Sequence, residues 1–181
     1  MSKILVDTID TRSGTSTLTL GSSNAGTIAL GSGDVQSNFL YPAFEAQGAS
    51  NQTSISTTTL TKVVFGTEIY DTNGKFADSR FTPTVAGTYF IYSTVLLAGT
   101  EDQITQFYIA IYKNGSQQYF SFHQNNSSDI NKFPLNISSA IDLDADDFVE
   151  IYIRGISANS STFTVENGSG LSRFGAYRIG T

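Results

Sequence analysis

Few side chains in this sequence have the chemistry that catalysis requires, and His123 is the only histidine. Residues 122–126, which contain it, read as a strand end that enters a polar loop. A Ser-His-Asp triad would have to use His123, but the sequence has no G-x-S-x-G nucleophile motif. Because the chain has no cysteine, thiol catalysis and cysteine-ligated zinc are excluded as well. We therefore predict a solvated or hydrogen-bonded His123, no catalytic residue and no cofactor.

The densest acidic cluster consists of Asp142, Asp144, Asp146 and Asp147. Its spacing begins like a D-x-D-x-D calcium loop. Asp147 stands at position six, where the EF-hand requires glycine, and Ile153 stands at position twelve, where it requires glutamate. We therefore predict a solvated turn before the strand that begins at Phe148, and no metal site. A carboxylate pair could also hydrolyse glycosides, but nothing in the sequence selects one pair from the others.

Charge and composition narrow the function classes further. Charged residues make up 14% of the chain and the net charge is −6, so a cationic surface for nucleic acid is not expected. No apolar stretch approaches the roughly 20 residues of a membrane-spanning helix. The first six residues are followed by Asp7 and Asp10, and this start is too short and too acidic for a signal peptide. We expect neither nucleic-acid binding nor insertion into a membrane.

The elements that position the side chains are short strands separated by turn signals. Asn-Gly pairs, which favour tight hairpin turns, occur at residues 73–74, 114–115 and 167–168. No segment shows a convincing helical period of 3.6 residues. Residues 41–181 are therefore predicted to form one all-β domain, an antiparallel sandwich or jelly roll.

The predicted strand after Gly87 is apolar on both faces. One face carries Tyr89, Ile91, Val95 and Leu97, and the other carries Phe90, Tyr92 and Leu96. One face can fill the sandwich, whereas the other would be an exposed apolar patch unless a second subunit covered it. Residues 107–112 and 148–153 repeat this pattern. The predicted subunit interface includes Tyr89, Tyr92, Phe107, Tyr108 and Tyr152. The alternative is a monomer with a wide core.

Several motifs resemble, in their order, those of the C1q/TNF-like jelly-roll domain. Residues 81–92 read F-T-x-x-x-x-G-x-Y-F-x-Y, and residues 70–76 before them read Y-D-T-N-G-K-F. Residues 109–115 resemble the mid-domain hairpin of that family, residues 143–152 its penultimate strand, and residues 172–178 its closing strand. The resemblance covers residues 41–181. It implies a trimeric jelly roll whose subunits pack through aromatic strands.

Residues 1–40 precede this domain and contain a short repeat. The sequence Thr-Leu-Thr-Leu-Gly-Ser at residues 17–22 returns as Thr-Ile-Ala-Leu-Gly-Ser at residues 27–32. Each copy alternates polar and apolar residues and stops at glycine, which is typical of a short strand and turn. Because such strands need a partner, we predict an extended β-arm that docks on a larger assembly. The predicted anchoring residues are Ile4, Val6, Leu18, Leu20, Ile28 and Leu30. A flexible linker is the alternative.

Residues 3–14 and 17–21 also resemble the opening of many phage structural proteins, mainly tail-fibre and particle-surface proteins of viruses that infect marine bacteria. The two resemblances together imply a non-enzymatic, homotrimeric virion protein. It would be made in the bacterial cytoplasm and would decorate the capsid surface as a head fibre, anchored by the arm to other virion proteins.

Binding to a host glycan or protein would use the polar loops at residues 124–131 or 157–161. The alternatives to capsid decoration are a short tail fibre that binds the host receptor, and a non-viral bacterial C1q-like module for glycan or protein ligands. A small hydrolase on the same scaffold is a third, supported only by carboxylates that nothing selects.

Overall fold

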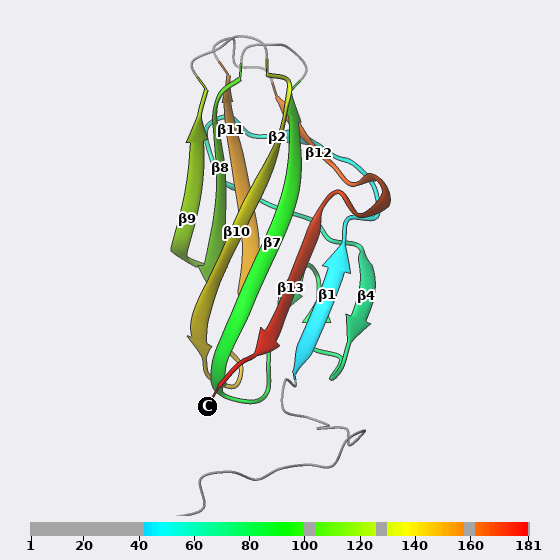
Figure 1. Ribbon diagram of the computed structural model, residues 1–181, viewed down its shortest axis with the longest axis vertical. Coiled ribbons are helices and arrows are strands. Elements are labelled where there is room, and N and C mark those ends of the chain that lie inside the picture. The colour runs from blue at the N-terminus through cyan, green and yellow to red at the C-terminus, as the bar shows by residue number, and fades with distance from the viewer. Residues whose placement is uncertain (1–41, 100–103, 126–129, 158–161, 181) are drawn as a thin grey trace, which may run out of the picture. The chain divides into compact units, whose positions relative to one another are not determined.

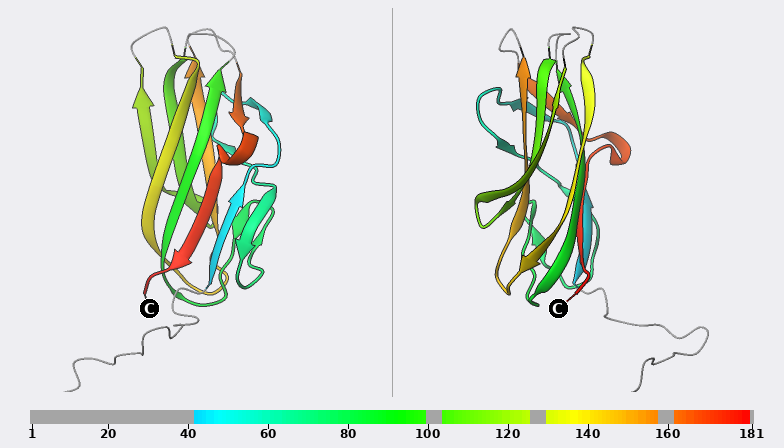
Figure 2. Two further views of the ribbon diagram at one scale, coloured as in Figure 1. Left: turned by 45° about the vertical axis from the view of Figure 1, so that its right-hand side comes forward. Right: turned by 60° about the vertical axis from the view of Figure 1, so that its left-hand side comes forward.

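A computed structural model describes residues 42–99, 104–125, 130–157 and 162–180 (Figure 1). Over these ranges the chain forms strands and one short 3-10 helix, η1 (Gly168–Gly170). The strands make two sheets that face each other, as the turned views in Figure 2 show. Every pair of neighbouring strands within these ranges is antiparallel. The predicted antiparallel sandwich is therefore confirmed.

The seven-stranded sheet is built around the longest strand, β7 (Gly87–Gly99). One edge of β7 pairs with β10 (Lys132–Leu143), and the other edge is shared between β13 (Arg173–Arg178) and β12 (Phe163–Glu166). Beyond β13 lie β1 (Ala43–Gln47) and β4 (Thr67–Asp71), and beyond β12 lies β2 (Gln52–Ile55). The long β7 thus holds both ends of the sheet together.

The six-stranded sheet is centred on β11 (Val149–Ser157) and β8 (Ile104–Lys113), which pair along most of their length. On the far side of β8 lies β9 (Ser116–Gln124). On the far side of β11 lie the short strands β3 (Thr61–Lys62) and β6 (Arg80–Phe81), and β5 (Phe76–Ala77) pairs with β6. Strand β9 is therefore an edge strand, and it is exposed along its whole length.

The core lies between the sheets and follows the predicted alternation. One set of β7 residues is 0% exposed: Tyr89, Ile91, Val95 and Leu97. The other set lies half-buried on the outer face of the sheet: Phe90, Tyr92 and Leu96. Across the core, the Phe44 ring of β1 stacks on the Phe81 ring of β6 with centroids 4.5 Å apart. Aromatic stacking of this kind joins the two sheets.

The three Asn-Gly pairs form turns, but only one closes a hairpin. Asn114 and Gly115 have φ angles of 52° and 75° and join β8 directly to β9. Residues 73–74 instead connect β4 to β5, which belong to different sheets, and residues 167–168 lead into η1. Gly74 also has a positive φ of 60°, whereas Asn167, with a φ of −113°, and Gly168 do not, so an Asn-Gly pair alone does not determine the turn or which strands become neighbours.

Candidate functional site

His123 lies on the exposed strand β9, and its ring packs on a residue of β10. Its ring stacks on Phe133 of β10, with centroids 4.3 Å apart and planes inclined by 18°, and Phe133 stacks on buried Phe107 at 4.8 Å. The imidazole thus connects β9 and β10, which are edge strands of the two sheets. Over the ranges that the structure describes, no three histidine, aspartate or glutamate side chains lie close enough to hold a metal ion.

The acidic cluster before β11 forms a hydrogen-bonded turn. Asp147 pairs with Lys113 Nζ at 2.8 Å through Oδ2, which also accepts the backbone N–H of Asp144 at 2.8 Å. The Asn114 amide donates to Asp147 Oδ1 at 2.6 Å. The hydrogen bond from Lys113 does most to lower the pKa of Asp147 to about 2. These contacts fasten the acidic turn to the β8–β9 hairpin, which is a structural role.

Two of the five residues predicted for the subunit interface lie inside the sandwich. Tyr89 and Phe107 are each 0% exposed within a single chain. The Tyr89 hydroxyl donates to the backbone oxygen of Val85 at 2.7 Å, and burial raises the pKa of Tyr89. The prediction is corrected at both positions, because a fully buried side chain offers no surface for a second subunit to cover.

The other three predicted interface residues are partly exposed, but they do not share one surface. Tyr92 lies on the outer face of the seven-stranded sheet. Tyr108 and Tyr152 lie on the outer face of the six-stranded sheet, on the neighbouring strands β8 and β11. The thickness of the sandwich separates these two outer faces. The structure therefore does not bring the five residues together.

An aromatic cluster surrounds Tyr92, and we name it the aromatic face: Phe90, Tyr92 and Tyr177. Their ring centroids lie 5.5 Å apart for Phe90 and Tyr177, 6.3 Å for Phe90 and Tyr92, and 6.5 Å for Tyr92 and Tyr177. Gly175 lies opposite Tyr92 in the β7–β13 register, and a Cβ atom there would overlap the Tyr92 ring. The missing side chain lets the ring lie flat over β13. Tyr177 was not among the predicted interface residues.

The polar end of Tyr92 is satisfied within the chain. Its hydroxyl donates to Glu45 Oε2 at 2.7 Å, and Arg173 Nη1 lies 3.0 Å from Glu45 Oε1. Burial, followed by the hydrogen bond to Glu45, raises the pKa of Tyr92, so the phenol remains neutral. The ring is thereby fixed in position with its apolar body on the surface.

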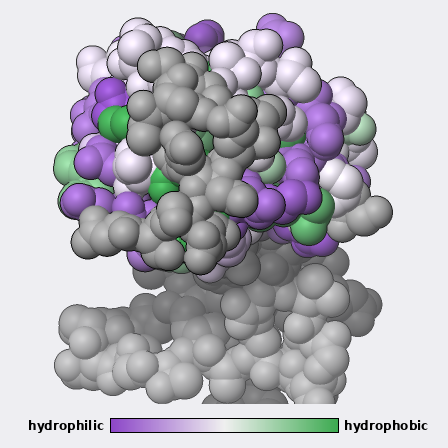
Figure 3. Space-filling model, turned by 90° about the horizontal axis from the view of Figure 1, so that it is seen from above, coloured by the Kyte–Doolittle hydropathy of each residue, from purple (hydrophilic) through white to green (hydrophobic). Residues whose placement is uncertain are grey.

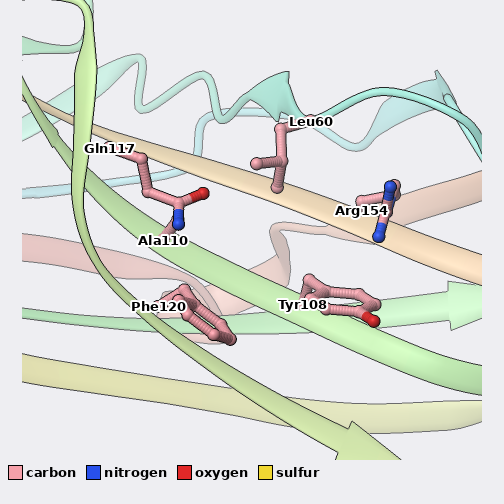
Figure 4. Close-up of a pocket in the computed structure, with 6 residues that line it drawn as sticks. All are labelled: Leu60, Tyr108, Ala110, Gln117, Phe120 and Arg154. Atoms are coloured by element: carbon pink, nitrogen blue, oxygen red, sulfur yellow. The ribbon is translucent and has the colours of Figure 1, made fainter.

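A pocket of about 300 Å³ opens on the outer face of the other sheet. We name it the Ala110 pocket, and it is lined by Leu60, Tyr108, Ala110, Gln117, Phe120 and Arg154 (Figure 4). Cross-strand register places Ala110 of β8 between Phe120 of β9 and Tyr152 of β11. Ala110 is 0% exposed and lies at the bottom of the pocket, beneath its larger neighbours.

Arg154 is the charged residue of this pocket, and it was not among the predicted site residues. Its guanidinium carbon lies 4.4 Å from the centroid of the Tyr108 ring. The available signal was the alternation of Tyr152 and Arg154 along one face of the strand. Its position over Tyr108 depends on the register between β8 and β11, which the sequence does not reveal.

Figure 3 shows one end of the sandwich, coloured by hydropathy. Among the described residues visible there, most are hydrophilic or intermediate, and hydrophobic ones occur only in small patches. The predicted host-binding loops are described only at residues 124–125, 130–131 and 157. The remaining loop residues lie outside the described residues, and so do the predicted anchoring residues Ile4, Val6, Leu18, Leu20, Ile28 and Leu30.

One further property concerns membranes. Within the described part of the chain, no helix has the length and apolar character needed to cross a bilayer.

Comparisons with known proteins bear on the fold. No protein-family model matches the sequence, and no curated protein sequence matches it. The resemblance of residues 3–14 and 17–21 to phage proteins stays a prediction.

Solved structures do match. The globular domain of zebrafish complement 1qA protein aligns with a TM-score of 0.53 and 17% identity, over 76% of this chain and 97% of that chain. Murine APRIL at pH 5.0 aligns with a TM-score of 0.56 and 11% identity, over 76% of this chain and 98% of that chain. At such low identity the likeness concerns the fold alone. The sandwich has the fold of a C1q/TNF-like jelly roll.

Proposed function

We propose that this chain is a non-enzymatic structural protein of a bacteriophage particle, which assembles as a homotrimer and displays its sandwich on the capsid surface. Residues 1–40 would anchor it to other virion proteins. The observation that carries the proposal is the aromatic face. Its three rings are partly exposed in one chain, and the hydroxyl of Tyr92 is already bound to Glu45. Such a surface is stabilised when another copy covers it.

Three copies are favoured by the resemblance to C1q/TNF-like domains, which implies trimers packed through aromatic strands. A closed three-fold arrangement covers the aromatic face of every copy and leaves no open end for further growth. The non-enzymatic part of the proposal is supported by the packing role of His123 and the structural role of Asp147. The location on a phage particle rests on residues 3–14 and 17–21 of the arm.

Light scattering on the full chain tests the assembly. We expect a mass three times that of the 19.5 kDa chain. The double change Phe90→Ser with Tyr177→Ser removes most of the apolar area of the aromatic face and should yield a monomer. Phe120→Ser alters an exposed aromatic residue on the opposite sheet and, as the matched control, should remain trimeric. A monomer at every concentration of the unaltered chain would contradict the proposal, as would a trimer that the double change leaves intact.

The copy number in purified virus particles tests the location. Quantitative mass spectrometry against the major capsid protein should give a large number that follows the capsid lattice. A small multiple of three would instead indicate a short tail fibre. Absence from the particles would overturn the virion proposal.

A second candidate is a bacterial C1q-like binding module for glycan or protein ligands. The Ala110 pocket favours it, because an open hollow with aromatic and cationic walls is typical of a ligand site. This candidate would be favoured if the chain bound a glycan or protein ligand and were absent from purified virus particles.

A further inference from the structure

Two aromatic residues, Tyr108 and Phe120, line the Ala110 pocket, and Phe122 lies beside both of them. Phe120 is 56% exposed, although it is a large apolar side chain. The Phe120 and Phe122 rings lie 6.3 Å apart with planes inclined by 21°, and Phe122 and Tyr108 lie 5.6 Å apart at 22°. Phe122 thus stacks on both neighbouring rings, and Phe120 keeps more than half of its surface exposed. The faces of these rings carry partial negative charge, which attracts the weakly positive C–H groups on the apolar face of a pyranose ring.

The charge of the pocket is a single guanidinium group without a carboxylate partner. On the same sheet, Lys62 and Arg80 pair with Glu150, and Lys113 pairs with Asp147. Within the described part of the chain, Arg154 pairs with no carboxylate, and none of the six lining residues is acidic. An unpaired cation is notable in a chain whose net charge is −6.

The hydrogen-bonding capacity of Arg154 is also largely unused. Its Nη1 contacts the backbone oxygen of Thr58 at 3.4 Å, which is a long hydrogen bond. Its buried Nε finds no acceptor among the described residues. The cation–π contact with the Tyr108 ring holds the guanidinium at the pocket wall. A planar guanidinium with free N–H groups suits a carboxylate, which it can bind through two parallel hydrogen bonds.

We propose that the Ala110 pocket binds a glycan that carries a carboxylate. The apolar face of one sugar ring lies on the exposed ring of Phe120, the carboxylate accepts hydrogen bonds from Arg154, and the Gln117 amide serves the hydroxyl groups. The volume of about 300 Å³ is at the lower end of the range for small-molecule sites, which suits one ring of a longer chain. An acidic peptide would satisfy Arg154 but would make little use of the exposed Phe120 ring.

This inference does not depend on a viral role, because it rests on the pocket alone. It is also compatible with the proposed trimer. The aromatic face belongs to β7 and β13, whereas the pocket belongs to the opposite sheet. Assembly through the aromatic face would leave the pocket open.

Matched pairs of oligosaccharides test the proposal on the full chain. The probes are cellotetraose and galactotetraose, each with its derivative in which the C6 hydroxymethyl groups are oxidised to carboxylates, and lactose with 3′-sialyllactose. Binding is measured by saturation-transfer NMR and calorimetry at low salt. We expect at least one charged probe to bind, with an affinity about tenfold or more above that of its neutral counterpart, because its hydrogen bonds to Arg154 involve two charged groups.

Single changes then assign the site. Arg154→Gln should abolish the preference for the charged probe, and Phe120→Ser should weaken binding of both members of a pair about tenfold or more. Arg173→Gln, which removes a cation from the opposite sheet, should leave binding unchanged. Light scattering that shows the same oligomeric state for all variants separates a failure of this proposal from a failure of assembly.

Several outcomes would overturn the proposal. One is the absence of binding by every charged probe, and another is equal affinity for charged and neutral members of each pair. An equal loss in Arg154→Gln and Arg173→Gln would show that net charge alone attracts the probe. Tighter binding of a hexaglutamate peptide than of any charged glycan would assign the pocket to acidic peptides instead.

Discussion

At the scale of single residues, Glu150 connects three separate parts of the chain. It is 2% exposed although it belongs to the outer face of β11, because Lys62 and Arg80 cover it. Lys62 Nζ lies 2.6 Å and Arg80 Nη2 lies 2.9 Å from its Oε1. Burial raises the pKa of Glu150, but the hydrogen bonds and charges of Lys62 and Arg80 outweigh burial and lower it. The carboxylate thus fastens the short strands β3 and β6 to β11.

Replacing this carboxylate tests its contribution to stability. We expect Glu150→Gln to lower the free energy of unfolding by about 2 kcal/mol, because hydrogen bonds to a charged group are lost while both cations regain water. The measurement is urea denaturation at one fixed protein concentration. Glu68→Gln, at an exposed position, is the control and should change little.

The free energy of unfolding should depend on pH differently in the original chain and in Glu150→Gln. The pKa of Glu150 lies below its ordinary value of 4.5 in the folded state. Its stabilisation is therefore fully present above that value and is lost as the pH falls through the folded pKa. The difference in free energy of unfolding between the original chain and Glu150→Gln should narrow as the pH falls from about 6 to about 2. A gap that stays constant over this range would show that the carboxylate contributes no charge-dependent stability.

Whether the sequence could place a single residue in the core or on the surface depended on the alternation of side chains along a strand. Residues 89 and 92 are three apart, so a strand places them on opposite faces, and residues 107 and 108 are opposed in the same way. One member of each pair therefore had to lie in the core. Because both faces are apolar, the pattern could not show which one, and Tyr89 and Phe107 were assigned to an interface that they do not reach. Arg154 was missed because its lack of a partner is a property of the folded chain.

At the scale of elements, two positions require glycine for different structural reasons. Gly155 of β11 lies under the ring of Phe163, and a Cβ atom at residue 155 would come within 2.5 Å of that ring. Gly115 of the β8–β9 turn has a φ of +75°, and a Cβ atom there would meet nothing within 4 Å. The first glycine avoids a clash, and the second permits a backbone conformation. Sequence alone predicted the turn glycine from its Asn-Gly context, but not the packing glycine.

Replacing each glycine by alanine should distinguish the clash at residue 155 from the backbone strain at residue 115. Gly155→Ala should lower the free energy of unfolding by about 2 kcal/mol through overpacking, and Phe163→Leu in the same chain should restore part of the loss. Denaturant titrations of the two single variants and the double variant give the coupling. Strictly additive losses would contradict the clash.

Gly115→Ala should lower the free energy of unfolding by roughly 1 kcal/mol, because alanine in a left-handed conformation is strained. No change of a neighbouring side chain should rescue it. The same titrations check this, and a loss larger than that of Gly155→Ala would contradict the assignment of strain to one site and clash to the other.

At the scale of the whole molecule, assembly through the aromatic face should link stability to concentration. Subunits that associate only when folded stabilise one another by mass action, so the melting temperature should rise with protein concentration. The melting temperature of the Phe90→Ser, Tyr177→Ser chain should not depend on protein concentration. Calorimetry over a wide concentration range checks both expectations. A concentration-independent melting temperature in the unaltered chain would speak against assembly.

The fold class was predictable from the sequence, because turn signals, strand alternation and motif order all pointed to an antiparallel jelly roll. The role on a phage particle is a different kind of statement. Jelly rolls carry many functions, and no property of a sandwich fixes where it is attached. The only sequence support for that location lies in residues 1–40, outside the described residues.

The place of β13 in the sheet has a consequence for the timing of folding. Strand β13 lies between β1 and β7, so it joins the first strand of the sandwich to its longest one (Figure 1). While the ribosome is still making residues 173–178, β1 and β7 have no partner at these edges. The sheet can therefore close only after residues 173–178 have been made, by contacts between segments far apart in the chain. Topologies of this kind fold slowly, in milliseconds to seconds, and newly made chains expose unpaired edges until β13 arrives.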